Sequence, residues 1–326
     1  MRAAIAALFL ALAACSSAVP IIFDTDMCTD CDDVGALALL HALADLGEAR
    51  ILATMASTRN PAAAPCIDAI NAWYGRPGLP IGVPKGEGKY EPSTYAAELA
   101  RRFPHRLESP EAAPDAARLY RELLLREPDR SVVIVTVGYL TNLAGLLRLP
   151  AEGELPSGME VVRRKVREWV CMGGNFIGSP ARDDLKLGNV NFTRDSKSAL
   201  EAIRNWPTPL MFVGREIGSV PSGLKVGARF RELAEPHPVR AAYELYFGGV
   251  AKDRHVADPT AVLYAVRGRR DYWVAETRGY MDLRPDMTFD WKSDRDSAQG
   301  YLIKRAPDRT LERILEELMM RAPARD

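Results

Sequence analysis

Stretches with the spacing of strands and helices alternate along most of this chain. A short apolar run at 20–23 suits a buried strand, and helical spacing of apolar residues extends from Asp32 to Gly47. Further strands are predicted at 51–55, 132–136, 169–172 and 210–213, and further helices at 62–74, 114–126, 141–147 and 196–205. This alternation predicts an α/β fold with a mostly parallel central sheet and helices on both faces.

Polar residues directly follow several predicted strands, and parallel sheets bind ligands at these carboxyl ends. The clusters are Asp24-Thr25-Asp26, Thr58-Arg59-Asn60, Gly138 and Gly173-Gly174-Asn175. Beyond Pro221 the chain holds two helical patches and a C-terminal region with Trp and Arg. We interpret this region as a continuation of one domain that spans 19–326.

The composition excludes two classes of protein. Lys and Arg (43) balance Asp and Glu (43) among the 326 residues, which argues against a nucleic acid as the main partner. No apolar run reaches about 18 residues, the length that a membrane-spanning helix needs. The hydrophobic fraction of 47% is sufficient for a sizeable core.

Residues 1–18 have the pattern of an export signal. Arg2 precedes an apolar run at 3–14, and Cys15 follows it. Leu12-Ala13-Ala14-Cys15 resembles a lipobox, which would make Cys15 the acylated mature N-terminus; cleavage after Ala18 is the alternative. We expect an exported, periplasmic lipoprotein that contacts the membrane only through its lipid anchor.

Four further cysteines allow two interpretations. An oxidising compartment favours pairing within an even set of cysteines. Cys28 and Cys31 have the spacing of a zinc or redox motif, but no second pair or nearby His accompanies them. The sequence leaves open one or two disulfides, or buried free thiols, among Cys28, Cys31, Cys66 and Cys171.

The strongest chemical signal is a cluster of five carboxylates within residues 24–33, at the turn between the first strand and the first helix. A solvated acidic loop is the simpler interpretation. At the carboxyl end of a strand, however, a hard divalent cation would relieve the mutual repulsion. Calcium takes six to eight oxygen ligands and is therefore the favoured ion. Such an ion can lower the pKa of a bound water while a neighbouring carboxylate takes the proton, which indicates a hydrolase.

Five segments resemble the inosine–uridine-preferring nucleoside hydrolase superfamily. The string F-D-T-D-x-x-x-D-x-D-D from Phe23 is similar to the signature D-x-D-P-G-x-D-D, with two extra residues and Met27-Cys28 in place of Pro-Gly. Four later segments follow in the family's order. Val137-Gly138-Tyr139-Leu140-Thr141-Asn142 resembles T-G-P-L-T-N, and Met172-Gly173-Gly174 matches M-G-G. Asn189-Val190-Asn191 resembles E-F-N, and Asp258-Pro259 resembles the start of D-P-x-A-V in H-D-P-x-A-V.

The resemblance implies calcium-dependent hydrolysis of the N-glycosidic bond of a ribonucleoside or related N-riboside. It assigns the calcium to Asp26, Asp33, Asp258 and the carbonyl of Val137, with Asp26 also the general base. Asp30 lies in the insertion, where it can replace a ligand or cap the turn, and Asp24 supports the site from behind.

The resemblance also implies contacts to the substrate. It places Asp32 on the ribose hydroxyls, and amides near the sugar at Asn60, Asn175, Asn189 and Asn191. For each Asn considered alone, a turn or cap role is the alternative.

Two departures from the family pattern concern catalysis. Ala257 stands where the family has a His before the Asp, and Asn189 stands where it has Glu. His255 can replace the missing acid, or it is a surface residue. Trp206-Pro207-Thr208-Pro209 and Gly214-Arg215-Glu216-Ile217-Gly218 resemble a group of exported relatives whose nucleoside substrate is inferred from membership.

Two rival functions remain from the sequence. Ile21-Ile22-Phe23-Asp24-Thr25-Asp26 also fits a haloacid-dehalogenase-type phosphatase, in which the first Asp is the nucleophile. Alternatively, the chain is a calcium-dependent sugar- or nucleoside-binding lipoprotein without catalysis. The base, the sugar and the oligomeric state, including a homo-oligomer, are left open.

Overall fold

The computed structural model describes residues 18–27, 29–176, 189–219 and 222–324. The predicted export signal up to residue 17, with Cys15, and Cys28 lie outside these residues. Among the described residues, no helix combines the length and apolarity that crossing a membrane requires.

Strands and helices alternate as the sequence predicted. The strands are β1 Val19–Thr25, β2 Ala49–Ala56, β3 Ile81–Gly82, β4 Val132–Thr136, β5 Val166–Met172, β6 Leu210–Val213, β7 Lys225–Val226, β8 Arg254–His255, β9 Trp273–Leu283, β10 Phe289–Ser293 and β11 Gln299–Lys304. The α-helices are α1 Asp32–Asp45, α2 Ala63–Trp73, α3 Ala96–Arg102, α4 Ala116–Arg126, α5 Thr141–Arg148, α6 Gly158–Lys165, α7 Val190–Thr193, α8 Ser196–Asn205, α9 Arg215–Gly218, α10 Pro238–Tyr246, α11 Ala257–Arg267 and α12 Asp308–Met319, and a 3-10 helix spans Ala228–Glu232.

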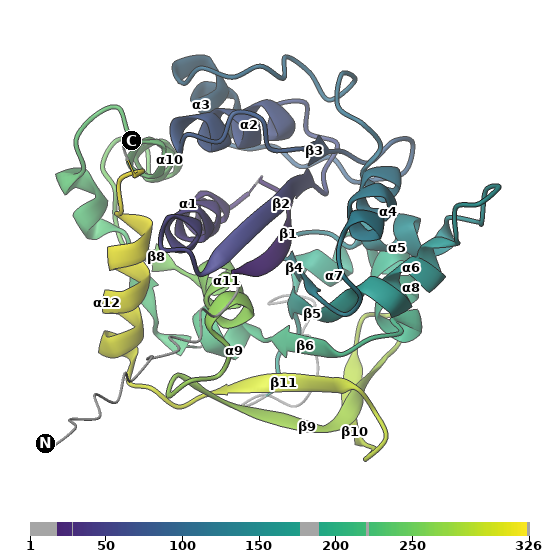
Figure 1. Ribbon diagram of the computed structural model, residues 1–326. Coiled ribbons are helices and arrows are strands. Elements are labelled where there is room, and N and C mark those ends of the chain that lie inside the picture. Colours follow the sequence, from purple (N-terminus) through teal and green to yellow (C-terminus); the bar gives the residue numbers. More distant parts are fainter. Residues whose placement is uncertain (1–17, 28, 177–188, 220–221, 325–326) are drawn as a thin grey trace, which may run out of the picture.

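A nine-stranded sheet forms the centre of the molecule, in the order β10-β9-β11-β6-β5-β4-β1-β2-β3 (Figure 1). All neighbours from β11 to β3 run parallel, whereas β9 is antiparallel to both β11 and β10. The mostly parallel α/β fold predicted from the sequence is therefore confirmed.

Helices cover both faces of the sheet (Figure 1). Ile21 and Phe23 of β1 belong to the core on the side of α1, α2 and α11, and Ile22 between them belongs to the core on the side of α4, α5 and α8. Successive side chains of a strand point to opposite faces, so an uninterrupted apolar strand serves both cores.

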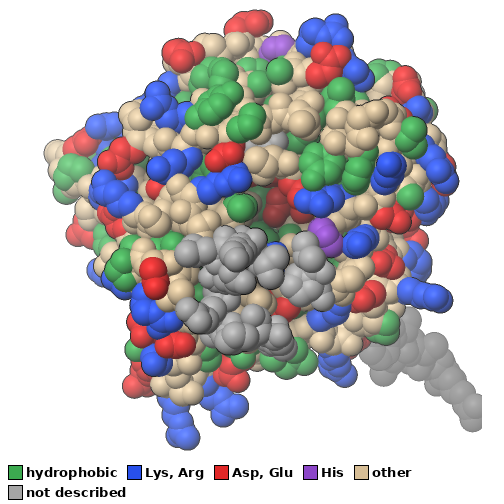
Figure 2. All heavy atoms as spheres, turned by 180° about the vertical axis from the view of Figure 1, so that it is seen from behind, with side chains coloured by type: hydrophobic (Ala, Val, Ile, Leu, Met, Phe, Trp, Pro, Cys, Tyr) green, Lys and Arg blue, Asp and Glu red, His purple; other side chains and the backbone are tan. Residues whose placement is uncertain are grey.

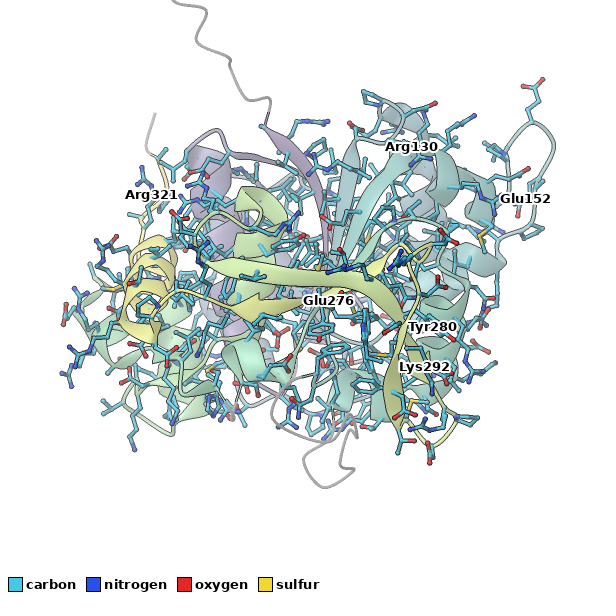
Figure 3. The ribbon with its side chains drawn as sticks, turned by 90° about the horizontal axis from the view of Figure 1, so that it is seen from below. Arg130, Glu152, Glu276, Tyr280, Lys292 and Arg321 are labelled. Carbon is cyan, nitrogen blue, oxygen red and sulfur yellow. The ribbon has the colours of Figure 1, made fainter. Side chains whose placement is uncertain are left out.

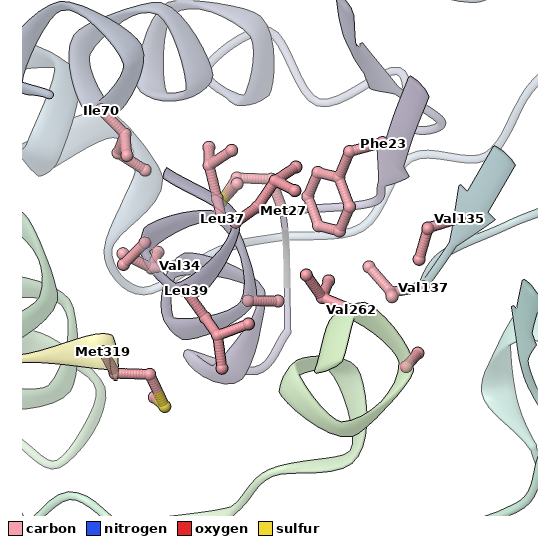
Figure 4. Close-up of a cluster of buried hydrophobic side chains, with 14 of the residues drawn as sticks. Phe23, Met27, Val34, Leu37, Leu39, Ile70, Val135, Val137, Val262 and Met319 are labelled. Atoms are coloured by element: carbon pink, nitrogen blue, oxygen red, sulfur yellow. The ribbon is translucent and has the colours of Figure 1, made fainter. Parts of the chain in front are cut away.

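Helix α1 is buried along most of its length. Residues 32–43 are all buried, and their apolar side chains pack against Met27, Phe23 and α11 (Figure 4). A helix that is apolar on every side belongs in the interior. Gly47 follows its end with a φ of 72°, a conformation that suits glycine. The acidic start of this helix is thereby fixed within the core.

The C-terminal region extends the sheet in a way that the sequence analysis did not predict. Strand β11 pairs with β6, and β9 and β10 add an antiparallel edge. Figure 3 shows Glu276 and Tyr280 on β9 and Lys292 on β10 along this edge. The sequence predicted two helical patches in this region, whereas its described residues form three α-helices, α10, α11 and α12, the last of which packs on α1.

The three described cysteines support the free-thiol interpretation. Cys31, Cys66 and Cys171 are buried and unpaired. Burial raises the pKa of each thiol, so these side chains pack as small apolar groups.

Leu39→Ala in α1 should lower the free energy of unfolding by about 2–5 kcal/mol, because it empties a fully buried position in the main core. Urea denaturation followed by circular dichroism measures this change. Leu46→Ala, at the exposed end of the same helix, is the matched control and should cost less than about 1 kcal/mol. Equal losses in the two variants would contradict the described burial of α1.

Candidate functional site

The polar strand ends meet where the order of the sheet reverses. Strands β2 and β3 lie on one side of β1, and β4, β5 and β6 on the other, so β1 and β4 flank a topological switch point. A pocket of about 220 Å³ opens at this edge. Figure 2 shows acidic side chains inside a hollow near the middle of one face, between cationic side chains. The pocket is lined by Asp26, Thr29, Asp30, Asp32, Asp33, Val137, Met172, Asn189, Val190, Asn191, Arg215, Ser219, Arg254, His255, Ala257 and Asp258.

Three buried carboxylates converge in the pocket. Asp32 and Asp33 belong to the first turn of α1, and Asp258 to the first turn of α11. One oxygen from each lies within 4.8 Å of the other two. Two ligands of one cation at about 2.4 Å cannot lie more than about 4.8 Å apart, and the three carboxylates meet this condition for an ion of the size of calcium.

Backbone and hydroxyl donors orient these carboxylates. Thr25 Oγ1 donates to Asp33 Oδ1, which also accepts from the backbone N–H of Met27 at 3.3 Å. Asp32 Oδ2 accepts from the backbone N–H of Asp258 at 3.2 Å. Both helix N-termini favour negative charge at this point. The donors compensate only part of the charge, which leaves the site suited to a cation.

Burial raises the pKa of every carboxyl in the group. The pKa values of Asp32, Asp33 and Asp258 lie well above the usual range of an aspartate. Burial is the largest cause, and the neighbouring carboxylates raise these pKa values further. Burial raises the pKa of Asp26 to about 6, against a lowering effect from Asp33 and Arg194. A cation bound among these carboxylates would oppose this effect, because it favours their charged form.

Asp24 lies behind the pocket rather than in its lining. It is 1% exposed, and its carboxylate accepts from Tyr120 Oη at 2.9 Å and from Asn142 Nδ2 at 3.1 Å. Burial raises its pKa to about 7. A phosphatase of the haloacid-dehalogenase type needs this first Asp as an open nucleophile, so the arrangement disfavours that rival.

Asp30, a predicted metal ligand, has a different partner in the structure. Arg254 Nε lies 2.8 Å and 3.0 Å from the two carboxylate oxygens of Asp30, and the Asp30 carbonyl accepts from Tyr95 Oη at 2.7 Å. Asp30, which lies in the insertion, is thereby tied to β8. Asp30 contributes to the pocket wall as one half of an ion pair, and Arg254, its partner, was not identified from the sequence.

The four predicted amides divide into two pairs. Asn191 lines the pocket, and its Nδ2 donates to the carbonyl of Val137 at 3.0 Å; Asn189 lines it too and caps α7. Asn60 is not in the lining. Its Oδ1 accepts from the N–H of Ala62 at 2.9 Å, and its Nδ2 donates to the carbonyl of Glu91 at 2.7 Å. The Asn60 side chain thus closes a turn just before α2, whose N-cap is Ala62. Asn175 is buried and also lies outside the lining.

His255 lines the same pocket as Asp26. It is half-buried, and this burial is the main reason that its pKa is lowered; the nearby charges of Arg254 and Lys225 lower the pKa further. Ala257 also lines the pocket. The structure therefore brings His255 to the site rather than leaving it on the open surface. Arg215 and Ser219 line this wall as well; the segment Gly214-Arg215-Glu216-Ile217-Gly218 was noted in the sequence only as a resemblance.

Comparisons with known proteins agree with this geometry. The model of the family "Inosine-uridine preferring nucleoside hydrolase" matches residues 21–306. The fold is similar to that of the inosine-uridine preferring nucleoside hydrolase from Bacillus anthracis (TM-score 0.66, 15% identity, 93% of this chain and 99% of that one). It is also similar to the purine-preferring ribonucleoside hydrolase from Gardnerella vaginalis (TM-score 0.67, 16% identity, 92% of this chain and 98% of that one). A third similar structure is the type III effector protein XopQ complexed with adenosine diphosphate ribose (TM-score 0.65, 18% identity, 95% of this chain and 94% of that one). A search of curated proteins finds no match.

In a metal chelator, the melting temperature should fall by at least about 4 °C between pH 5 and pH 7.5. Raised carboxyl pKa values mean that the folded protein binds more protons than the unfolded chain. This stabilisation is complete below about pH 4 and is lost as pH rises through about 6 for Asp26 and about 7 for Asp24.

Differential scanning fluorimetry in EGTA and in calcium measures this dependence. Calcium should raise the melting temperature at pH 7.5 and flatten the profile, because it binds the charged carboxylates. Asp24→Asn removes one titrating group and should reduce the slope in EGTA. A melting temperature that is constant or rises with pH in EGTA would contradict the raised pKa values.

Proposed function

Since this chain belongs to the inosine-uridine preferring nucleoside hydrolase family, we propose that it hydrolyses the N-glycosidic bond of a ribonucleoside or related N-riboside with the help of a calcium ion. The observation that carries the proposal is the convergence of Asp32, Asp33 and Asp258 beside Asp26 in one pocket. The family supports the reaction class, and the adenosine diphosphate ribose in one similar structure supports an N-riboside ligand.

The ligands of the proposed ion are oxygens of the chain. Asp26, Asp33 and Asp258 would hold it with the carbonyl of Val137, whose second lone pair stays free of the bond from Asn191. Calcium accepts such a flexible set of oxygens more readily than magnesium, which demands a near-octahedral shell. When bound, calcium would lower the pKa of a water and hold it close to the ribose hydroxyls.

Asp26 is the proposed general base. Asp26 lines the pocket and is only 5% exposed. It would therefore lie beside a water that attacks the sugar. With a pKa of about 6, Asp26 is mostly ionised at neutral pH and can still accept a proton efficiently. The proton moves from the water to the carboxylate oxygen as the water attacks the anomeric carbon.

Other residues of the pocket position the sugar. Asp32, one of the three converging carboxylates, would accept hydrogen bonds from the ribose hydroxyls, while Asn191 fixes the carbonyl of Val137. Cleavage of an N-glycosidic bond passes through an oxocarbenium-like state, and the surrounding carboxylates would stabilise its positive charge. Positioning and electrostatics therefore account for most of the proposed rate enhancement.

His255 is the proposed acid for the leaving base. It lines the pocket near Ala257, the residue that stands where the family pattern has His. Its lowered pKa leaves the imidazole mostly neutral at pH 7, so the protonated fraction is small and its protons are more acidic. We therefore expect this chain to favour N-ribosides whose leaving groups need little help.

Release of reducing sugar from a panel of purine, pyrimidine and nicotinamide ribosides should require calcium and be abolished by EGTA. Asp26→Asn should lower turnover by more than about 1000-fold, because it removes a ligand and the base together. Asp115→Asn, which changes an exposed cap of α4, is the matched control and should retain turnover.

The outcomes separate the rival functions. Calcium-dependent binding of ribosides without any release of base, even after long incubation, would favour a binding lipoprotein. Release of phosphate instead of reducing sugar would favour a phosphatase. Full turnover in EGTA would exclude the proposed calcium ion.

His255→Ala should slow hydrolysis of inosine by about 100-fold or more and leave p-nitrophenyl riboside nearly unaffected. The reason is that p-nitrophenolate leaves without a proton, whereas hypoxanthine needs one. Steady-state kinetics of both substrates across pH 5–8 measure the difference. Equal slowing of the two substrates would assign His255 to structure, and unchanged turnover of inosine would show that another residue is the acid.

A further inference from the structure

Asn189 presents an unpaired donor to the pocket. Its side-chain Oδ1 accepts from the backbone N–H of Asn191 at 3.0 Å, which fixes the orientation of the amide. The residue is 2% exposed, and its Nδ2 has no hydrogen-bond partner. A buried donor without a partner is costly, so its presence in the lining points to an acceptor on a ligand.

Arg215 lies beside the same segment of backbone. Its backbone N–H donates to the carbonyl of Gly174 at 2.9 Å, and a Cβ on Gly173 would lie 2.9 Å from Asn189 Nδ2. Asn189 and Arg215 therefore flank Gly173 and Gly174 at the ends of β5 and β6. Among the described residues of the lining, Arg254 is paired with Asp30, whereas the guanidinium of Arg215 has no hydrogen bond or ion pair.

These two donors adjoin the ends of β5 and β6 rather than the end of β1, which carries Asp24 and Asp26. Strands in a sheet are about 4.8 Å apart, so β5 and β6 lie about 10 and 14 Å from β1 along the sheet. The pocket is thus acidic at the β1 end and carries hydrogen-bond donors with a positive charge at the β6 end. A neutral sugar would satisfy the first end and leave the second unpaired.

We propose, on the basis of the function proposed above, that the substrate is a phosphorylated N-riboside whose ribose phosphate binds Asn189 Nδ2 and the guanidinium of Arg215. A guanidinium matches the oxygens of a phosphate through paired N–H donors, and a third oxygen remains for the amide. The family pattern has Glu at the position of Asn189, and a carboxylate there would repel this group. A carboxylate on the base is the other source of such an anion, and the choice of substrates separates the two.

Three substrates with related leaving groups test the proposal: nicotinamide riboside, nicotinamide mononucleotide and nicotinic acid riboside. The value of kcat/KM for the mononucleotide should exceed that for nicotinamide riboside by about 10- to 100-fold. A preference for nicotinic acid riboside over both would place the anion on the base and overturn the proposal. Equal or better turnover of nicotinamide riboside would also overturn it, while the proposed function would stand.

Two variants assign the preference to these residues. Arg215→Met and Asn189→Asp should each lower the ratio of kcat/KM for the mononucleotide over the riboside by about 10-fold or more. Asn189→Asp keeps the oxygen that caps α7, loses the donor and adds a negative charge that would repel the phosphate. Arg278→Met removes an exposed charge of β9 and should leave the ratio unchanged. A parallel loss on both substrates would indicate a structural role and count against the proposal.

Calorimetry of the products keeps the two proposals distinguishable. In calcium, ribose 5-phosphate should bind at least about 10-fold more tightly than ribose, and Arg215→Met should remove the difference. Should no riboside be hydrolysed, the proposed function fails, and this measurement still decides the phosphate site. Equal binding of the two sugars would overturn the phosphate site.

Discussion

The burial of several like charges at the carboxyl end of β1 is the constraint on which the rest of this structure depends. Two carboxylates about 5 Å apart repel by about 3 kcal/mol in a medium of intermediate polarity. The chain offsets part of this repulsion with local donors: Thr25 and the N–H of Met27 at Asp33, and the N–H of Asp258 at Asp32. The remainder requires protons or a cation. Because protons dissociate as the pH rises, a cation would be the partner that keeps the group compact once its carboxyls are ionised.

The packing of two helices determines the geometry of this group. Asp33 and Asp258 occupy the first turns of α1 and α11, whose buried sides contact each other within one core. The two N-termini therefore meet at the pocket, and both favour negative charge there. Gly218 allows α11 to start close by, since a Cβ on it would lie 2.7 Å from the carbonyl of Val256. The apolar core, rather than the polar loop alone, thus holds the oxygens within the reach of one ion.

The sequence predicted the fold and the acidic end of the pocket because both depend on local patterns. Strand–helix alternation gave the parallel sheet, and the carboxylates around Asp26 follow β1 directly. The rest of the site depends on contacts between segments that are distant in the sequence, and the periodicity of apolar residues does not reveal such contacts. Arg254 reaches Asp30 across more than 200 residues, and Asn60 satisfies its amide at the backbone of Glu91 instead of in the pocket. Likewise, the strands β9 and β10 at the sheet edge are half-exposed, so their apolar pattern is too weak to predict.

Two departures of this chain from the family pattern lie in the lining of the pocket. Asn189 and Ala257 both line the pocket, and the two cations Arg215 and Arg254 line it with them. The carboxylates that would hold the ion match the pattern, whereas the groups that would meet the rest of the substrate do not. Asn189 lies near the end of β5, whereas Asp26 follows β1, so a change at Asn189 could alter the substrate without changing how water would be activated. This separation would let a chain keep the carboxylates of its family pattern while its preferred N-riboside changes.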